Sequence, residues 1–187
     1  HMRRRYDNFI FFSAGPVGDH VLLVDVANHF YKATGIKSLL ILKHPNPFLN
    51  DLYLPYKENI EQFFFVGLRG VFRMILLSIK SIWQKNVFVL FLPIPLPKYL
   101  KVFIFFIRFF TRSRVVGMNL EGTKSFAVGC GYAHYLCKKN TIPMLAEPFT
   151  VSANRFLELL GYEEINWTPK IDYLLQPKIF DKFNIKK

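Results

Sequence analysis

Short, uninterrupted apolar runs recur along this chain, and most are followed by a turn and a segment with helical periodicity. The run at 8–13, NFIFFS, is continuous rather than alternating, which is typical of a strand buried on both faces of a sheet. Strands alternating with helices predict a doubly wound, mostly parallel sheet covered by helices on both faces, a Rossmann-like three-layer α/β fold. We expect strands at 8–13, 37–42, 61–66, 87–92, 114–118 and 171–175, and helices at 20–34, 48–54, 71–84, 98–111 and 147–160.

The chain has 187 residues, of which 51% are hydrophobic, enough for one domain with a sizeable core. We assign residues 1–5 to a tag remnant and basic start, 6–175 to the domain, and 176–187 to a basic tail or the start of an interdomain linker. The longest apolar stretch, 87–97, contains three prolines and ends at Lys98, so no segment is expected to span a membrane. No signal peptide is recognised, and a cytosolic, reduced setting is expected.

Metal and cofactor chemistry find little support in the sequence. Cys130 and Cys137 flank His134, but no fourth ligand can be identified for a zinc site. We therefore interpret the two cysteines as core or free thiols and expect neither a metal nor a cofactor.

In open parallel sheets, ligands bind beyond the carboxyl ends of the strands, near the point where the strand order reverses. This rule directs attention to the loops at 14–19, 43–47 and 93–97. The first, between strand and helix, can bind an anion through free backbone N–H groups and the positive helix end. It lacks the third glycine of the dinucleotide-binding fingerprint. The alternative is structural: Gly15 and Gly18 shape the turn, and Asp19 caps the helix.

The stretch 9–30, FIFFSAGPVGDHVLLVDVANHF, resembles the amino-terminal signature of the family 9 glycosyltransferases, which include the ADP-heptose:lipopolysaccharide heptosyltransferases. That signature is an apolar strand, a short Ser/Gly loop, a Gly-Asp pair and an apolar helix. RVVGMN at 114–119 and FLELLGY at 156–162 follow in the family's order. The resemblance implies the acceptor-binding, amino-terminal half of a GT-B glycosyltransferase, with the nucleotide-sugar donor bound by a second half that would begin where this chain ends.

The resemblance also implies site residues. Asp19 matches the family's proposed catalytic base, which takes the proton from an acceptor hydroxyl as that oxygen attacks the anomeric carbon. Ser13 stands where family members commonly have Lys or Arg, which leaves open any phosphate contact from this loop. His20 adjoins Asp19 and could line the cleft, or be solvated in the first helical turn. The acceptor-binding residues that we expect are Ser13, Gly15, Gly18, His20, His44 and Asn46.

Charge is strongly segregated along the chain. Nine Lys and Arg but no Asp or Glu lie between Gln62 and Leu120, so this segment supplies +9 of the net charge of +12. Large apolar residues alternate with these cations, a combination that favours attachment to an anionic membrane surface. Alternatively, the apolar faces pack on the sheet and the cations form a solvated rim; nucleic acid is the less favoured partner, because no nucleic-acid motif accompanies the charge. The membrane- or anion-binding residues that we expect are Arg69, Arg73, Lys80, Lys98, Lys101 and Arg108.

Together these features predict the acceptor-binding domain of an inverting glycosyltransferase that moves a sugar to a lipid-linked acceptor of the lipopolysaccharide type. The resemblance implies that the sugar is heptose. We expect the protein on the cytoplasmic face of the bacterial inner membrane, and the chain alone to lack turnover. Two alternatives remain open: a non-catalytic module that docks on anionic membrane or nucleic acid, and a nucleotide-binding Rossmann-like protein.

Overall fold

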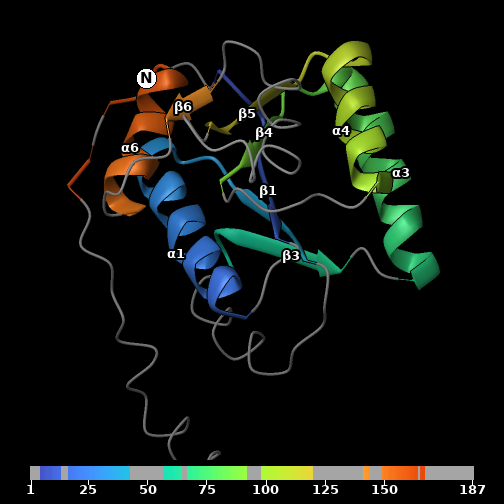
Figure 1. The fold of residues 1–187 in the computed structure, drawn as a ribbon, viewed down its shortest axis with the longest axis horizontal. Helices are drawn as coiled ribbons and strands as arrows, with labels where there is room; N and C mark the ends of the chain where they lie inside the picture. Colours follow the sequence, from blue (N-terminus) through green and yellow to red (C-terminus); the bar gives the residue numbers. More distant parts are fainter. Residues whose placement is uncertain are drawn as a thin grey trace, which may run out of the picture.

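The structure, a computed structural model, describes residues 5–13, 17–42, 57–64, 67–91, 98–119, 141–143, 149–163 and 165–166. Its centre is a sheet of six strands in the order β3-β2-β1-β4-β5-β6, and every neighbouring pair is parallel (Figure 1). This is the doubly wound order in which the chain adds strands first on one side of β1 and then on the other. The strands are β1 (Phe9–Ser13), β2 (Ser38–Leu42), β3 (Ile60–Phe64), β4 (Val87–Leu90), β5 (Arg114–Asn119) and β6 (Thr141–Pro143).

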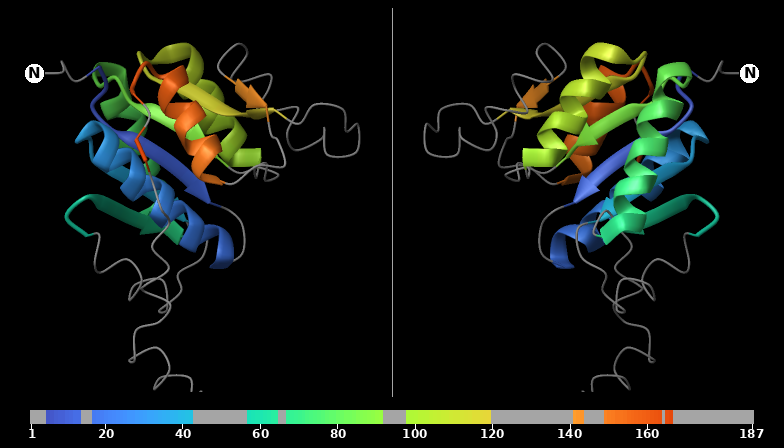
Figure 2. Two further views of the ribbon diagram at one scale, coloured as in Figure 1. Left: turned by 90° about the vertical axis from the view of Figure 1, so that its left-hand side faces the viewer. Right: turned by 90° about the vertical axis from the view of Figure 1, so that its right-hand side faces the viewer.

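Helices cover the two faces of the sheet in pairs (Figure 2). α1 (Val17–Thr34) contacts α6 (Phe149–Leu159) on one face, and α3 (Gly67–Trp83) contacts α4 (Lys98–Phe110) on the other. The change of face between α1 and α3 follows from the handedness of crossover connections, because β2 lies on one side of β1 and β4 on the other. The predicted three-layer α/β fold is confirmed.

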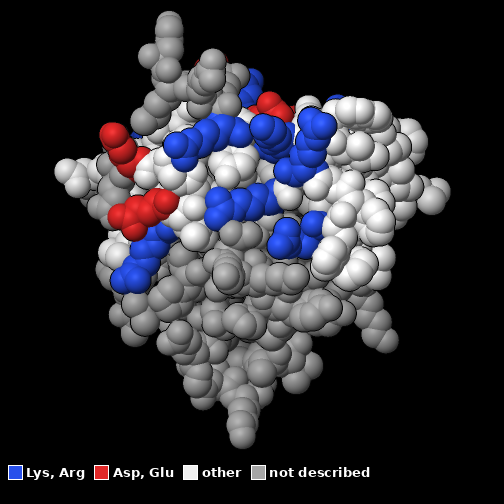
Figure 3. Space-filling view, turned by 90° about the horizontal axis from the view of Figure 1, so that it is seen from above, with Lys and Arg blue, Asp and Glu red and all other residues white. Residues whose placement is uncertain are grey.

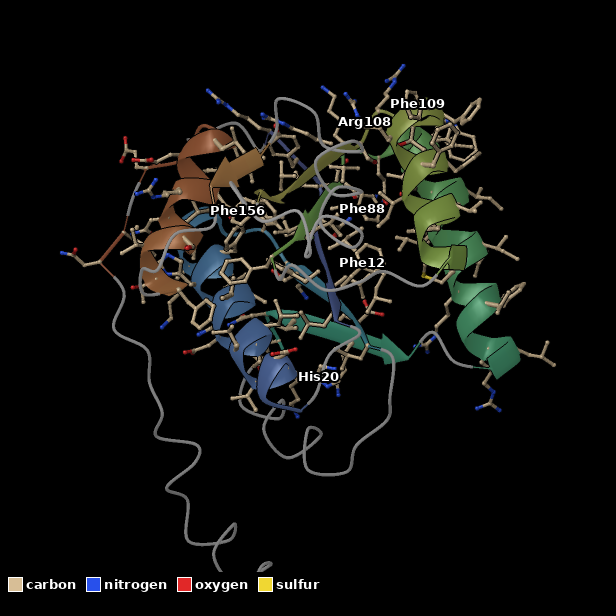
Figure 4. The ribbon with its side chains drawn as sticks, viewed as in Figure 1. Phe12, His20, Phe88, Arg108, Phe109 and Phe156 are labelled. Carbon is tan, nitrogen blue, oxygen red and sulfur yellow. The ribbon has the colours of Figure 1, made fainter. Side chains whose placement is uncertain are left out.

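The core has two halves, one on each face of the sheet. Alternate residues of β1 point into them: Phe9 and Phe11 pack with α1 and α6, whereas Ile10 and Phe12 pack with α3 and α4. The Phe30 ring of α1 meets the rings of Phe9 and Phe11 edge-on, with centroids 5.1 and 5.3 Å apart. On the other face, Phe12 stacks on Phe88 at 5.9 Å (Figure 4). Burial on both faces explains why β1 reads as a continuous apolar run.

The predicted element order is confirmed where the structure describes it, with shifted boundaries. α1 begins at Val17 rather than at residue 20, and α3 at Gly67 rather than at 71, since the ends of a helix are its least sharply defined part. Asp19 is therefore a residue of the first turn of α1, and the interpretation of Asp19 as the residue capping that helix is wrong. β6 was not expected. The predicted helix at 48–54 and strand at 171–175 lie outside the described residues.

The two-sided core generates a stability prediction. Phe11→Ala is expected to lower the free energy of unfolding by about 3–5 kcal/mol, because Phe11 is fully buried and its loss leaves a cavity. The matched control is Phe109→Ala on α4, where the ring is 47% exposed and the expected loss is below about 1 kcal/mol. Urea unfolding of both variants tests this. Equal losses would contradict the assignment of Phe11 to the core and Phe109 to the surface.

Candidate functional site

The strand order reverses at β1, which has β2 on one side and β4 on the other. The chain leaves β1 for α1 on one face and leaves β4 for α4 on the opposite face. Such diverging connections leave a crevice at the carboxyl edge, where ligands bind in open parallel sheets. Residues 14–16 and 92–97, which make these connections, are not among the described residues. The candidate site is therefore defined by the end of β1 and the start of α1.

Three of the predicted site residues lie together at this edge. Ser13 ends β1, and Gly18 and Asp19 lie in the first turn of α1. Asp19 is half-buried, at a position where backbone N–H groups are not used inside the helix and the helix dipole favours an anion. A hydroxyl group brought to this edge can therefore donate a hydrogen bond to the Asp19 side chain.

The next residue, His20, is not exposed to solvent as one of the two sequence-based interpretations expects. It is only 2% exposed, at the lower end of α1 in Figure 4, so the interpretation of a solvated first-turn histidine is wrong. Gly15, His44 and Asn46 lie outside the described residues. Among the residues that are described, no group of three or more His, Cys, Asp or Glu could hold a metal ion.

Sequence reasoning missed a row of buried polar residues on α1. Asp25, Asn28 and His29, at helical spacing, are 7%, 7% and 1% exposed. Asn154 of α6 donates from Nδ2 to the Ile165 carbonyl at 3.3 Å, which leaves its Oδ1 to accept from His29 Nε2 at 2.7 Å. This bond ties α1 to α6. The spacing of Asp25 and His29 at i and i+4 was the available signal, but it predicts a shared helix face without saying that the face is covered.

Burial changes the ionisation of this row. It raises the pKa of Asp25 from 3.8 to about 6, with a smaller opposing effect from Lys32. It lowers the pKa of His29, and the hydrogen bond to Asn154 offsets part of that change. Both effects have one physical cause, the lower polarity of the space between α1 and its neighbours, which disfavours either charged form.

The outer face of the α3–α4 layer is apolar. Of the fourteen large hydrophobic residues found exposed in the described part of the chain, eight belong to α3 and four to α4. On α3 they include Leu68, Phe72, Ile75 and Ile79, spaced so that they form one line along the side opposite the core. On α4 they are Val102, Phe105, Phe109 and Phe110. A contiguous patch of many exposed apolar side chains typically marks an interaction site. Hereafter the α3–α4 face means these twelve residues, which also include Val71, Leu76, Ile82 and Trp83.

The cations flank this apolar line rather than mixing with it. Arg73 and Lys80 line a cavity together with residues of β2 and β3, and Arg69 lies one turn before Arg73 in the same row. Arg108 lies near the end of α4 beside Phe109 (Figure 4). Lys98 and Lys101 belong to the first turn of α4, and their side chains are not described. Figure 3 shows Lys and Arg gathered at the end of the molecule where the strands begin, next to an uncharged surface over α3 and α4.

Neither α3 nor α4 can cross a bilayer: in the part of the chain that the structure describes, no helix is both long and apolar enough to do so.

Comparison with known proteins adds little. No protein-family model and no curated protein matches the sequence. The fold is similar to a crystal structure of Anabaena Alr3699/HepE in complex with UDP and glucose, at 12% sequence identity and a TM-score of 0.41, over 83% of this chain. This chain spans about half of that protein, 50% of its length. A likeness at this level assigns neither a family nor a function.

The buried carboxyl group of Asp25 predicts a pH dependence. Its native pKa of about 6 exceeds its unfolded value of 3.8, so the native state holds the extra proton between these values and stability falls as the pH rises through them. The full difference amounts to about 3 kcal/mol. Asp25→Asn is expected to remove this dependence, making the variant more stable than the wild type at about pH 7 and close to it at about pH 4.

His29 contributes with the opposite sign, since its lowered pKa costs stability as the pH falls below about 6.5. The measured quantity is therefore the difference between Asp25→Asn and wild type in urea unfolding across this range, from which the His29 contribution cancels. A difference that does not change with pH would contradict a raised pKa for Asp25.

Proposed function

We propose that this chain is the acceptor-binding domain of a sugar transferase that works on a lipid-linked acceptor at an anionic membrane surface. The observation that carries the proposal is the position of the α3–α4 face. Both helices follow parallel strands, so both begin at the carboxyl edge where Asp19 lies. Leu68, which is 90% exposed, stands in the first turn of α3. An acceptor lipid held beside Leu68, at the start of α3, would thus present its sugar near the candidate site.

The apolar and basic parts of the surface suit a bilayer interface. Exposed side chains such as Phe72 and Trp83, 62% and 70% exposed, would enter the boundary between headgroups and acyl chains. Neighbouring cations, which add roughly 1 kcal/mol each near an anionic leaflet, would contact lipid phosphates. The segment from Gln62 to Leu120 contains no acidic residue that would repel such a surface. The cytoplasmic face of a bacterial inner membrane is the location we propose.

The proposed chemistry is one displacement at the carboxyl edge. An acceptor hydroxyl attacks the anomeric carbon of a nucleotide-sugar, the bond from that carbon to the nucleotide diphosphate breaks, and the hydroxyl proton passes to Asp19. Asp19 would take this proton and also orient the hydroxyl for attack, since correct positioning accounts for a large part of such rate enhancements. A heptose donor and a lipopolysaccharide-type acceptor follow from the resemblance at Gly18-Asp19. On the same resemblance, a second domain would bind the nucleotide-sugar donor.

A second candidate is a docking module without catalysis. The exposed apolar residues of the α3–α4 face favour this candidate, because docking through them would not depend on Asp19. Only the transferase needs Asp19, so a test of that residue separates the two candidates.

The role of Asp19 is tested in an enzyme that carries this domain together with the proposed donor-binding domain. Asp19→Asn is expected to lower transfer about 10²–10⁴-fold while acceptor binding changes little, because the amide keeps the shape but cannot accept the proton. Transfer is measured with labelled nucleotide-sugar and binding by acceptor pull-down. Near-normal transfer would limit Asp19 to a structural role and favour the docking module.

Membrane docking is tested on the chain itself with vesicles of phosphatidylglycerol and phosphatidylcholine. Phe72→Ser with Ile79→Ser is expected to weaken binding to the anionic vesicles about tenfold or more, because both side chains are exposed on α3 and would be buried in lipid. The matched control is Phe149→Ser with Val151→Ser on α6, an exposed aromatic and aliphatic pair on the opposite layer.

The control pair should bind like the wild type, and raising the salt concentration should weaken binding without abolishing it. Equal losses for the two pairs, or equal binding to neutral vesicles, would contradict docking through the α3–α4 face. Salt-sensitive binding to oligonucleotides without a lipid preference would favour nucleic acid instead.

A further inference from the structure

A cavity of about 390 Å³ lies between α3 and the strands β1, β2 and β3. Its lining comes from the starts of β1, β2 and β3 and from α3 from Arg73 onward, so it opens at the end of the molecule opposite to Asp19. Ile10, Leu39 and Leu77, which belong to the core on this face, form its apolar floor. The cavity is thus separate from the candidate site at the carboxyl edge.

The cavity follows from how the helices cover the sheet. The core beneath α3 and α4 is centred on β1, β4 and β5, with Phe88, Ile104 and Val115 among its members. Leu39 on β2 and Glu61 on β3 lie farther from this centre and line the cavity together with residues of α3. A hollow therefore remains between α3 and the strands β2 and β3.

Three cations line this hollow: Lys37 before β2, and Arg73 and Lys80 two turns apart on α3. One acidic residue, Glu61, faces them. All four side chains are exposed, so their charged groups can reach a ligand in the mouth. Gln84 adds a neutral amide at the rim. Arginine binds phosphate through two parallel hydrogen bonds and lysine as a compact charge, so this set fits a phosphate group with more than one negative charge.

The size and position of the cavity further restrict the class of ligand that it can bind. Its volume falls in the range of small-molecule sites and exceeds what one phosphate ion would fill. Leu76 lines the cavity and is also part of the α3–α4 face, where it is 40% exposed. The polar cavity and the apolar face therefore meet along α3. In Figure 3 the basic surface borders the uncharged surface of the same two helices.

We propose that this cavity binds the phosphorylated headgroup of a membrane lipid whose acyl chains lie under the α3–α4 face. The inference rests on the proposed membrane docking and adds a headgroup preference to it. Lys37, Arg73 and Lys80 hold the phosphate, and the apolar floor accepts the carbon atoms next to it. A phosphate monoester is preferred to a diester, because the second negative charge can meet a second cation.

The experiment compares vesicles that contain phosphatidic acid, a monoester, with vesicles of phosphatidylglycerol, a diester, matched in surface potential. Wild-type chain is expected to bind the phosphatidic acid vesicles about tenfold more tightly. Arg73→Gln with Lys80→Gln should reduce this ratio to about one. The matched control, Arg69→Gln with Lys85→Gln, removes one Arg and one Lys outside the cavity. It should weaken binding to both kinds of vesicle and preserve the ratio.

Each of the other outcomes would overturn either the headgroup site or membrane docking. Equal wild-type binding to both vesicles, or loss of the ratio in the control variant, overturns the headgroup site and leaves membrane docking in place. Absence of binding to any vesicle overturns docking and the headgroup site together. Titration with soluble glycerol 3-phosphate distinguishes the sources of phosphate: it is expected to bind far more weakly than phosphatidic acid vesicles. Binding of equal strength would overturn a lipid source.

Discussion

Phe9 and Phe11 point into one layer of helices and Ile10 and Phe12 into the other, so strand β1 is buried only when both layers are in place. Its parallel neighbours β2 and β4 must then be reached by crossovers on opposite faces. Those crossovers put α1 and α3 on opposite sides and leave the strand-order reversal at the carboxyl end of β1. The place of Asp19 therefore follows from the burial of one strand.

The same constraint leaves the α3–α4 layer with two very different faces. Residues such as Leu77, Ile104 and Ile107 complete the core, yet the opposite side of both helices is also apolar. Hydrophobic residues on the side away from the core contribute little to folding, and they cost solubility. Docking on an anionic membrane would explain why these hydrophobic residues lie beside a row of cations.

The sequence predicted the fold well because its strongest signal, continuous apolar runs, reports burial on both faces. It predicted helix starts less well: α1 begins at Val17, three residues earlier than expected, since the glycine-bearing turn was interpreted as loop. The contact that covers His29 could not be predicted, because Asn154 of α6 lies more than a hundred residues away in the chain. Charge counting found the basic segment, but only the structure separates its cations from the apolar line of α3.

The most direct measurement of the central claim, that the α3–α4 face enters the bilayer, uses the fluorescence of Trp83, which is 70% exposed at the end of α3. Trp167→Phe leaves Trp83 as the sole tryptophan, since the chain has two. On saturation with anionic vesicles, the account predicts a blue-shifted emission and strong quenching by lipids brominated near the headgroup end of their acyl chains. Emission that stays unshifted and unquenched while the chain is bound would show that another surface makes the contact and would contradict the account.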